Sequence, residues 1–156
     1  MAPVGVSGGA EQVRVFRQDD RDFQPGELLR PWGDHFATLA DENRGAEDAL
    51  RTYEASSSEV RSNSIYTWRD RAFAERTWPI SGKTYLYELE VEECRVRHVG
   101  DVNCFTAIKA AIAAGEPFED HVACYWSGGA QPGEDWTEPR IEVLVCEAKV
   151  IARFEL

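Results

Sequence analysis

KTYLYELEV, residues 83–91, alternates apolar and polar side chains more regularly than any other segment of the chain. Tyr85, Tyr87, Leu89 and Val91 stand at every second position, and two glutamates lie among the residues between them. This period of two predicts a β-strand with one face toward a core. The fold is therefore expected to contain a β-sheet.

Weaker strand patterns occur on both sides of this segment, at residues 12–17, 64–68, 94–99, 140–146 and 149–154. Helix-forming residues predict short helices at residues 41–52, 70–77 and 105–114, and loops are expected at residues 55–58 and 128–133. Asn103 and Gly115 are the expected caps of the last helix, and Trp78-Pro79 should end the second. About seven strands and three helices in mixed order predict an α+β fold.

The length of 156 residues predicts one domain at residues 12–156, with residues 1–11 as a flexible N-terminal tail. No apolar run approaches the ~20 residues that a membrane span needs. The first dozen residues lack the basic and apolar regions of a secretory signal. The cytoplasm is therefore the expected location, and no membrane partner is expected.

The formal net charge is −11, from 17 basic and 28 acidic residues. Such a charge repels polyanions and argues against tight nonspecific binding to nucleic acid or to anionic membranes. It leaves nucleic acid open as a substrate. Arginines at positions 51, 61, 69, 71 and 76 concentrate positive charge in the middle of the chain. They are interpreted either as a solvated face or as a rim that faces phosphate.

The four cysteines, at positions 94, 104, 124 and 146, form no C-x-x-C pair. Together with His35, His98 and His121 they do not complete a zinc-ligand spacing, so no metal is expected. Scattered cysteines in an intracellular protein are usually small buried apolar side chains. His121 is expected to be an ordinary histidine, because no nucleophile motif accompanies it.

No glycine-rich phosphate-binding loop occurs in the chain, so a nucleotide would have to be held in another way. Cleavage of the bond between a charged nicotinamide and ribose needs a carboxylate that stabilises an oxocarbenium-like ribose. It also needs a forked donor for the pyrophosphate, a hydroxyl that orients the carboxylate, and an aromatic ring that stacks on nicotinamide. The residues with this chemistry are Glu142, Arg17, Ser62 or Ser64, and Tyr66 or Trp68.

Two strand segments resemble motifs of the mono-ADP-ribosyltransferases of the cholera-toxin, heat-labile-enterotoxin and pertussis-toxin group. FRQDDR, at residues 16–21, resembles the first-strand signature R-x-D-x-R. The resemblance places Arg17 at the NAD-binding arginine and Asp19 and Arg21 at its companions. RSNSI, at residues 61–65, resembles the S-T-S motif and places Ser62 and Ser64 at its serines.

A third segment, RIEVLV at residues 140–145, resembles the E-x-E or Q-x-E motif of that family and places Glu142 at the catalytic glutamate. The chain also resembles small bacterial members that share a YW-x-G segment, here Tyr125–Gly128, and a terminal P-x-x-E-V-L-V run. The resemblance implies an α+β fold with split mixed or antiparallel sheets and a few flanking helices. It implies NAD as a substrate, binding through Arg17, Asp19, Ser62 and Ser64. Tyr66 is the expected ring that stacks on nicotinamide in the same site.

Arg140 departs from the family pattern, which has Glu or Gln two positions before the catalytic glutamate. That position faces the acceptor of ADP-ribose. A cation there repels a guanidinium, so an arginine acceptor is not expected. A nucleobase, an anionic small molecule, an acidic side chain and water are left open as acceptors.

Each residue also has a purely structural interpretation. Glu142 can be a solvent-facing strand residue, Arg17 can pair with nearby aspartates, and the serines can cap a turn. Three functions remain: an ADP-ribosyltransferase, an NAD glycohydrolase, and a noncatalytic acidic binding or inhibitor module. Either enzyme suggests a toxin, a phage-derived modifier or an antibiotic-modifying enzyme.

Overall fold

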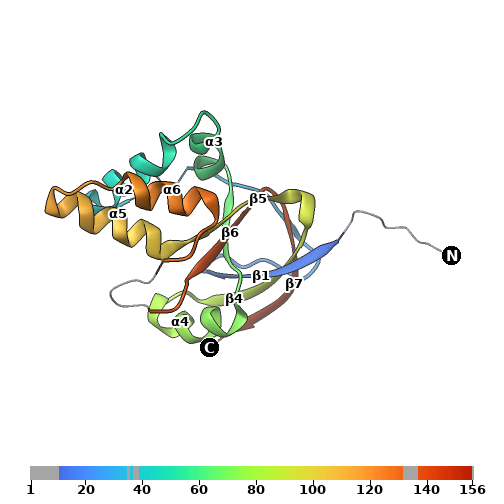
Figure 1. Ribbon diagram of the computed structural model, residues 1–156. Helices are drawn as coiled ribbons and strands as arrows, with labels where there is room; N and C mark the ends of the chain where they lie inside the picture. The colour runs from blue at the N-terminus through green and yellow to red at the C-terminus, as the bar shows by residue number, and fades with distance from the viewer. Residues whose placement is uncertain (1–10, 35, 37–38, 132–136, 156) are drawn as a thin grey trace. The chain divides into compact units, whose positions relative to one another are not determined.

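The computed structural model describes residues 11–34, 36, 39–131 and 137–155 (Figure 1). Within these residues, seven strands form one sheet in the order β2-β7-β4-β1-β3-β6-β5. The strands are β1 (Gln12–Asp19), β2 (Leu28–Leu29), β3 (Ile65–Trp68), β4 (Tyr85–Glu92), β5 (Val96–Asp101), β6 (Ile141–Val145) and β7 (Ala148–Glu155). The helices are α2 (Asp41–Arg51), α3 (Ser57–Ser62), α4 (Arg71–Ser81), α5 (Val102–Ala114) and α6 (Glu119–Ser127), with a 3-10 turn, η2, at Glu93–Arg95.

The mixture of helices with a sheet confirms the α+β prediction. The strands of the described residues join one sheet, whereas the resemblance implied split sheets. No helix in this part of the chain is both long enough and apolar enough to cross a membrane. The predicted tail at residues 1–11 lies outside the described residues except for Glu11.

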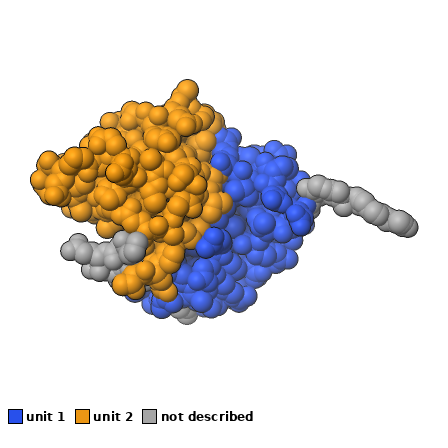
Figure 2. Space-filling view, viewed as in Figure 1, with its two compact units in different colours: residues 1–31, 65–97, 143–156 blue, residues 32–64, 98–142 orange. Residues whose placement is uncertain are grey.

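The chain divides into two compact units, which Figure 2 colours separately. Unit 1 comprises residues 1–31, 65–97 and 143–156. Unit 2 comprises residues 32–64 and 98–142. Arg17, Asp19 and Tyr66 therefore belong to unit 1, and Ser62, Ser64, Arg140 and Glu142 belong to unit 2.

Strand β4 organises unit 1, and it corresponds to the segment with the most regular alternation. It pairs antiparallel with β1 from Gln12↔Glu92 to Asp19↔Tyr85, and with β7 on its other side. Tyr87, Leu89 and Val91 of β4 point into a core that stabilises the sheet by removing apolar surface from water. That core consists of Val15, Leu29, Ile65, Tyr87, Leu89, Val91, Val143, Val145, Ala148 and Val150.

Helix α4 continues past Pro79 to Ser81, about one turn further than the sequence predicts. Pro79 lacks a backbone N–H and therefore cannot donate an intrahelical hydrogen bond. It lies in the last turn of the helix, so only this one hydrogen bond is missing. The buried Trp78 holds this end, because its Nε1 donates to the carbonyl of Lys83 at 2.9 Å. Gly82 then ends the helix in the left-handed conformation, with φ of 72°.

Unit 2 is mainly helical. Helix α5 packs against α2 on one side and α6 on the other, and the shared core contains Leu50, Cys104, Ile108 and Tyr125. Two of its helices are not predicted from the sequence: α3 lies partly in the expected loop at residues 55–58, and α6 falls where no element is expected. Both are short and are stabilised by tertiary contacts: α6 buries Val122 and Tyr125 in the core, and α3 buries Ser57 and Arg61.

Gly100 allows the closest approach in the unit 2 core. A Cβ at this position would lie 2.5 Å from the ring of Tyr125, which is fully buried. Any larger side chain would therefore displace Tyr125. The glycine is needed here for the space that it leaves.

Candidate functional site

Glu142 lies on β6 within unit 2, and its residue is only 9% exposed. One carboxylate oxygen, Oε2, accepts hydrogen bonds from Arg61 Nη1 at 2.9 Å and from the Tyr125 hydroxyl at 2.6 Å. Arg61 Nη1 also donates to the Tyr125 hydroxyl oxygen at 2.7 Å. The three side chains form a closed triangle, which holds the carboxylate in one orientation.

Glu47, on α2, extends this cluster beyond Arg61. Arg61 donates to its two oxygens through Nε at 2.9 Å and Nη2 at 2.6 Å. Arg51 Nε donates to the same carboxylate at 2.9 Å and binds Asp34 through both of its Nη atoms. Glu47 and Arg61 are 1% and 4% exposed, so their charges lie in a medium of low dielectric. Burial is tolerated because each charge faces an opposite charge and is hydrogen-bonded.

The second carboxylate oxygen of Glu142, Oε1, differs from Oε2 in its hydrogen bonding. In the part of the chain that the structure describes, Oε1 accepts no hydrogen bond, whereas Oε2 accepts two. No fully buried side-chain oxygen or nitrogen in the same residues lacks a partner. Oε1 is therefore reached by solvent. The cluster fixes one oxygen of an otherwise buried carboxylate, and the other oxygen contacts solvent.

Ser62 and Ser64 do not orient this carboxylate, although a serine was expected to do so. Ser62 Oγ donates to the carbonyl of Glu59 at 3.4 Å, and Ser64 Oγ donates to the carbonyl of Val60 at 2.6 Å. The chain is helical through Ser62, so both hydroxyls turn back onto carbonyls at the end of α3. Arg61 and Tyr125 hold the carboxylate in their place.

In unit 1, the structure brings Arg17, Asp19 and Tyr66 together. Arg17 donates from Nε to Asp19 Oδ2 at 2.8 Å and from Nη1 to the carbonyl of Tyr66 at 2.7 Å. Arg21 also binds Asp19, through its backbone N–H at 3.0 Å and its guanidinium at 2.7 Å. The expected neighbours on β1 and β3 are thus in contact within this unit.

Burial affects the pKa of both partners in the Arg17–Asp19 ion pair. Burial lowers the pKa of Arg17, although Asp19 opposes this effect, and an arginine remains protonated at neutral pH. For Asp19, burial alone would raise the pKa. The hydrogen bonds from Arg21 and the charge of Arg17 outweigh burial and lower the pKa to about 2. Asp19 is therefore ionised at neutral pH.

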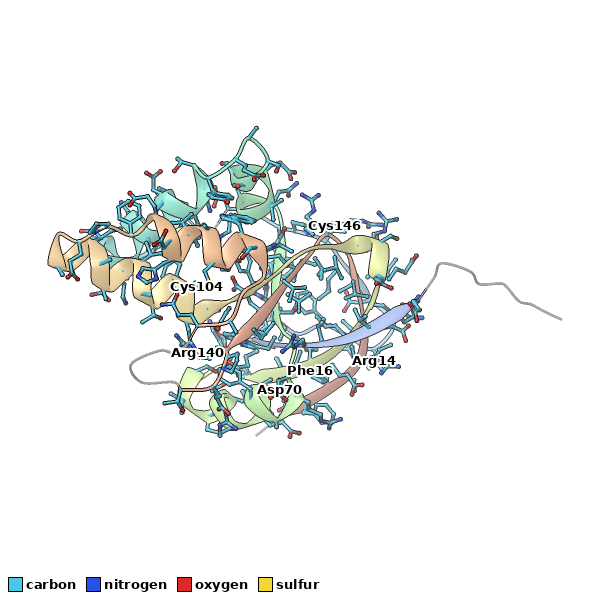
Figure 3. All side chains as sticks on the ribbon, viewed as in Figure 1. Arg14, Phe16, Asp70, Cys104, Arg140 and Cys146 are labelled. Atoms are coloured by element: carbon cyan, nitrogen blue, oxygen red, sulfur yellow. The ribbon has the colours of Figure 1, made fainter. Side chains whose placement is uncertain are left out.

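Arg140 lies against the first turns of α5 (Figure 3). Its Nε donates to Asn103 Oδ1 at 2.6 Å and its Nη2 donates to Thr106 Oγ1 at 2.8 Å. Its backbone N–H donates to Asp101 Oδ1 at 3.0 Å. An amide oxygen and a hydroxyl oxygen of α5 therefore hold this side chain, two residues before Glu142.

The interpretation of the central arginines as a phosphate-facing rim is wrong for Arg51 and Arg61, because both bind carboxylates in the cluster described above. Arg71 fits the solvated-face interpretation, since its side chain is 52% exposed and pairs with Glu75. Cys104 is buried as expected, but Cys94 is exposed. Burial raises the pKa of the Cys104 thiol.

His121 Nδ1 lies 3.0 Å from Gln131 Oε1 and joins no catalytic cluster in the described residues. Across the same residues, no group of three or more histidine, cysteine or acidic side chains has the arrangement of a metal site. A surface cavity of about 210 Å³ lies in unit 1, lined by Gln12, Leu28, Glu90, Glu92, Arg95, Glu147, Ala148 and Lys149. It contains none of the predicted site residues.

Sequence reasoning missed the residues that hold Glu142. Arg61 stands in the quoted RSNSI segment and Tyr125 in the YW-x-G segment, so both lie in motifs that attracted attention for other reasons. Glu47 carries no sequence signal, because a glutamate on a short polar helix is normally exposed. A comparison with protein-family models gives no match, and neither does a comparison with curated proteins.

Proposed function

We propose that the protein cleaves the nicotinamide–ribose bond of NAD and transfers ADP-ribose to an acceptor other than arginine. The observation that supports this most directly is the state of the Glu142 carboxylate. Arg61 and Tyr125 hold Oε2, and Oε1 contacts solvent, from which a ligand would reach it.

The chemistry needs one oriented negative charge. Nicotinamide leaves as a neutral base, so its departure requires no general acid. Positive charge develops on the ribose ring, and a carboxylate oxygen fixed beside the ring stabilises this charge without reorganising. The Arg61 guanidinium donates to Oε2 at 2.9 Å and so holds this carboxylate in one orientation.

The remaining assignments follow the resemblance to the ADP-ribosyltransferases. Arg17 is the proposed ligand of the pyrophosphate, with Asp19 orienting its guanidinium through the 2.8 Å ion pair. Ser62, Ser64 and Tyr66 are the other proposed NAD-binding residues. Arg140 is the proposed acceptor-side residue, and its charge disfavours a guanidinium as acceptor.

The decisive test is nicotinamide release from NAD by the Glu142→Gln protein. Glutamine keeps the shape of the side chain but removes the charge, so release should fall about 100-fold or more. Glu88→Gln is the matched control, since Glu88 is also a strand glutamate bound by an arginine, at 2.7 Å from Arg14, and lies in unit 1. Thermal unfolding of both variants verifies that they are folded.

Full activity of the Glu142→Gln protein would exclude this carboxylate as the catalytic group. Absence of both NAD binding and nicotinamide release in the unmodified protein would instead favour a noncatalytic binding module. The acceptor is found with labelled NAD and total cell lysate, followed by protease or nuclease digestion. Label in free ADP-ribose alone would identify a glycohydrolase, which uses the same carboxylate.

A further inference from the structure

An aromatic cluster lies on unit 2 next to the Glu142 carboxylate. It consists of Tyr53, Trp126 and His98. Tyr53, in the turn between α2 and α3, is 43% exposed, and its ring lies nearly parallel to that of Trp126 on α6. The interplanar angle is 7° and the ring centroids are 6.5 Å apart. Rings at this separation cover each other only in part, and Tyr53 remains exposed.

Trp126 is fixed in this arrangement. Its Nε1 donates to the carbonyl of Leu50 at 2.9 Å, and its other neighbour in the cluster, the His98 ring, lies 4.6 Å away. Burial lowers the pKa of His98, although the carbonyl of Tyr125 and the charge of Glu142 oppose this, so the ring is uncharged at neutral pH. The cluster is therefore a preformed surface of neutral rings.

Tyr125 connects the aromatic cluster to the carboxylate. Its ring centroid lies 4.8 Å from that of His98 and 5.1 Å from that of Trp126. Its hydroxyl is the group that donates to Glu142 Oε2 at 2.6 Å. The cluster and the proposed catalytic group are thus separated by a single tyrosine side chain.

We propose that Tyr53 and Trp126 bind the acceptor of ADP-ribose through a planar heteroaromatic ring, such as the base of a nucleoside. This inference rests on the proposed function. Every nucleobase has a π-face that stacks on tyrosine or tryptophan. An uncharged nucleoside suits the site better than a polyphosphate, because the chain has a net charge of −11.

In the proposed transfer, the bond between ribose C1′ and the nicotinamide nitrogen breaks, and its electron pair leaves on nicotinamide. The exocyclic amino nitrogen of the acceptor base forms the new bond to C1′ with its lone pair. This nitrogen then releases one of its protons to water. No oxidant or further reactant is required.

Binding is tested without NAD, by following the indole N–H signal of Trp126 in nitrogen–proton NMR spectra. The chain has five tryptophans, so Trp126→Phe identifies the signal. Adenosine, guanosine and cytidine are each added at millimolar concentration. At least one should shift this signal, and Tyr53→Ala should weaken that binding about tenfold through the loss of one stacking partner.

Two variants serve as controls. Tyr53→Phe keeps the ring and should bind as the unmodified protein does. Trp32→Ala removes another aromatic side chain of unit 2 that is 45% exposed, and should not change binding. The proposal is overturned if no nucleoside shifts the Trp126 signal, if Tyr53→Ala binds normally, or if NAD competes for the same rings.

A second measurement separates this inference from the proposed function. With labelled NAD and the bound nucleoside, Tyr53→Ala should lose label transfer to the nucleoside while it still releases nicotinamide. Loss of nicotinamide release in Tyr53→Ala would contradict an acceptor role for Tyr53. Nucleoside binding to a protein that never cleaves NAD would refute the proposed function and, with it, the acceptor assignment.

Discussion

At the scale of single residues, Asp19 shows how burial and pairing compete. It is 6% exposed, yet its pKa is lowered to about 2, because hydrogen bonds from Arg21 and the charge of Arg17 outweigh the effect of burial. A carboxyl group with a lowered pKa binds its proton more weakly in the folded state than in the unfolded state. The resulting stability is present above the unfolded pKa of about 3.8 and is lost as the pH falls toward 2.

Asp19→Asn should therefore reduce the free energy of unfolding at pH 7 by about 2 kcal/mol, and the difference should vanish near pH 2. Urea unfolding measured between pH 2 and pH 7 gives this difference directly. Asp48→Asn, at an exposed position on α2, is the control and should show little difference at any pH. A constant difference between Asp19→Asn and the unmodified protein across this range would contradict the ion-pair explanation.

Backbone conformation also explains why the prediction that a serine orients the Glu142 carboxylate was wrong. A serine hydroxyl near a carboxylate is a reasonable expectation from the motif, but hydroxyl direction depends on backbone conformation. Because α3 continues through Ser62, the carbonyls of Glu59 and Val60 are the nearest acceptors for the two serines. Arg61, one residue earlier, has the reach to contact Glu142 instead.

At the scale of elements, the start of α5 shows that a helix cap can also organise a loop. Asp101 caps the helix by accepting from the backbone N–H of Asn103, at 2.9 Å. It also accepts from the backbone N–H groups of Gln131 and Arg140, at 2.9 and 3.0 Å. The sequence indicated Asn103 as the cap, and the side chain of Asn103 binds Gln131 and Glu138 instead.

Asp101→Ala should lower the free energy of unfolding by about 3 kcal/mol or more, because it leaves buried backbone donors without an acceptor. Asp70→Ala is the matched control. Asp70 caps α4 by accepting one hydrogen bond from the backbone N–H of Ala72 at 3.0 Å and is exposed, so its loss should cost about 1 kcal/mol. Equal losses in the two variants, measured by denaturant unfolding, would mean that Asp101 acts only as a helix cap.

Most strands and three helices follow from local pattern. The alternation of β4, the capping of α4 by Asp70 and the left-handed Gly115 after α5 all depend on residues a few positions apart. Helix α6 could not be predicted in this way, because Tyr125 and Trp126 have weak helix propensity. Its conformation is stabilised by packing against α5 and by the contact of Trp126 with Leu50, 76 residues earlier in the sequence.

At the scale of the whole molecule, the net charge of −11 determines which partners are repelled. We expect no retardation of a DNA duplex in a gel at about 0.1 mM protein, whether salt is physiological or low. Lower salt strengthens repulsion between like charges, so dilution of the salt should not produce binding. Retardation that increases as salt decreases would reveal a basic surface that the charge balance conceals.

The sequence by itself determined the α+β class, most element positions and the charge of the surface, because these depend on composition and short-range periodicity. It also indicated which carboxylate and arginine to consider, through Glu142 and Arg17. Only the tertiary structure decided what surrounds Glu142. Arg61 lies 81 residues before it in the chain, and a pairing over that separation depends on how α3, α6 and β6 pack. Packing is a cooperative property of the whole core, so no local pattern in the sequence specifies it.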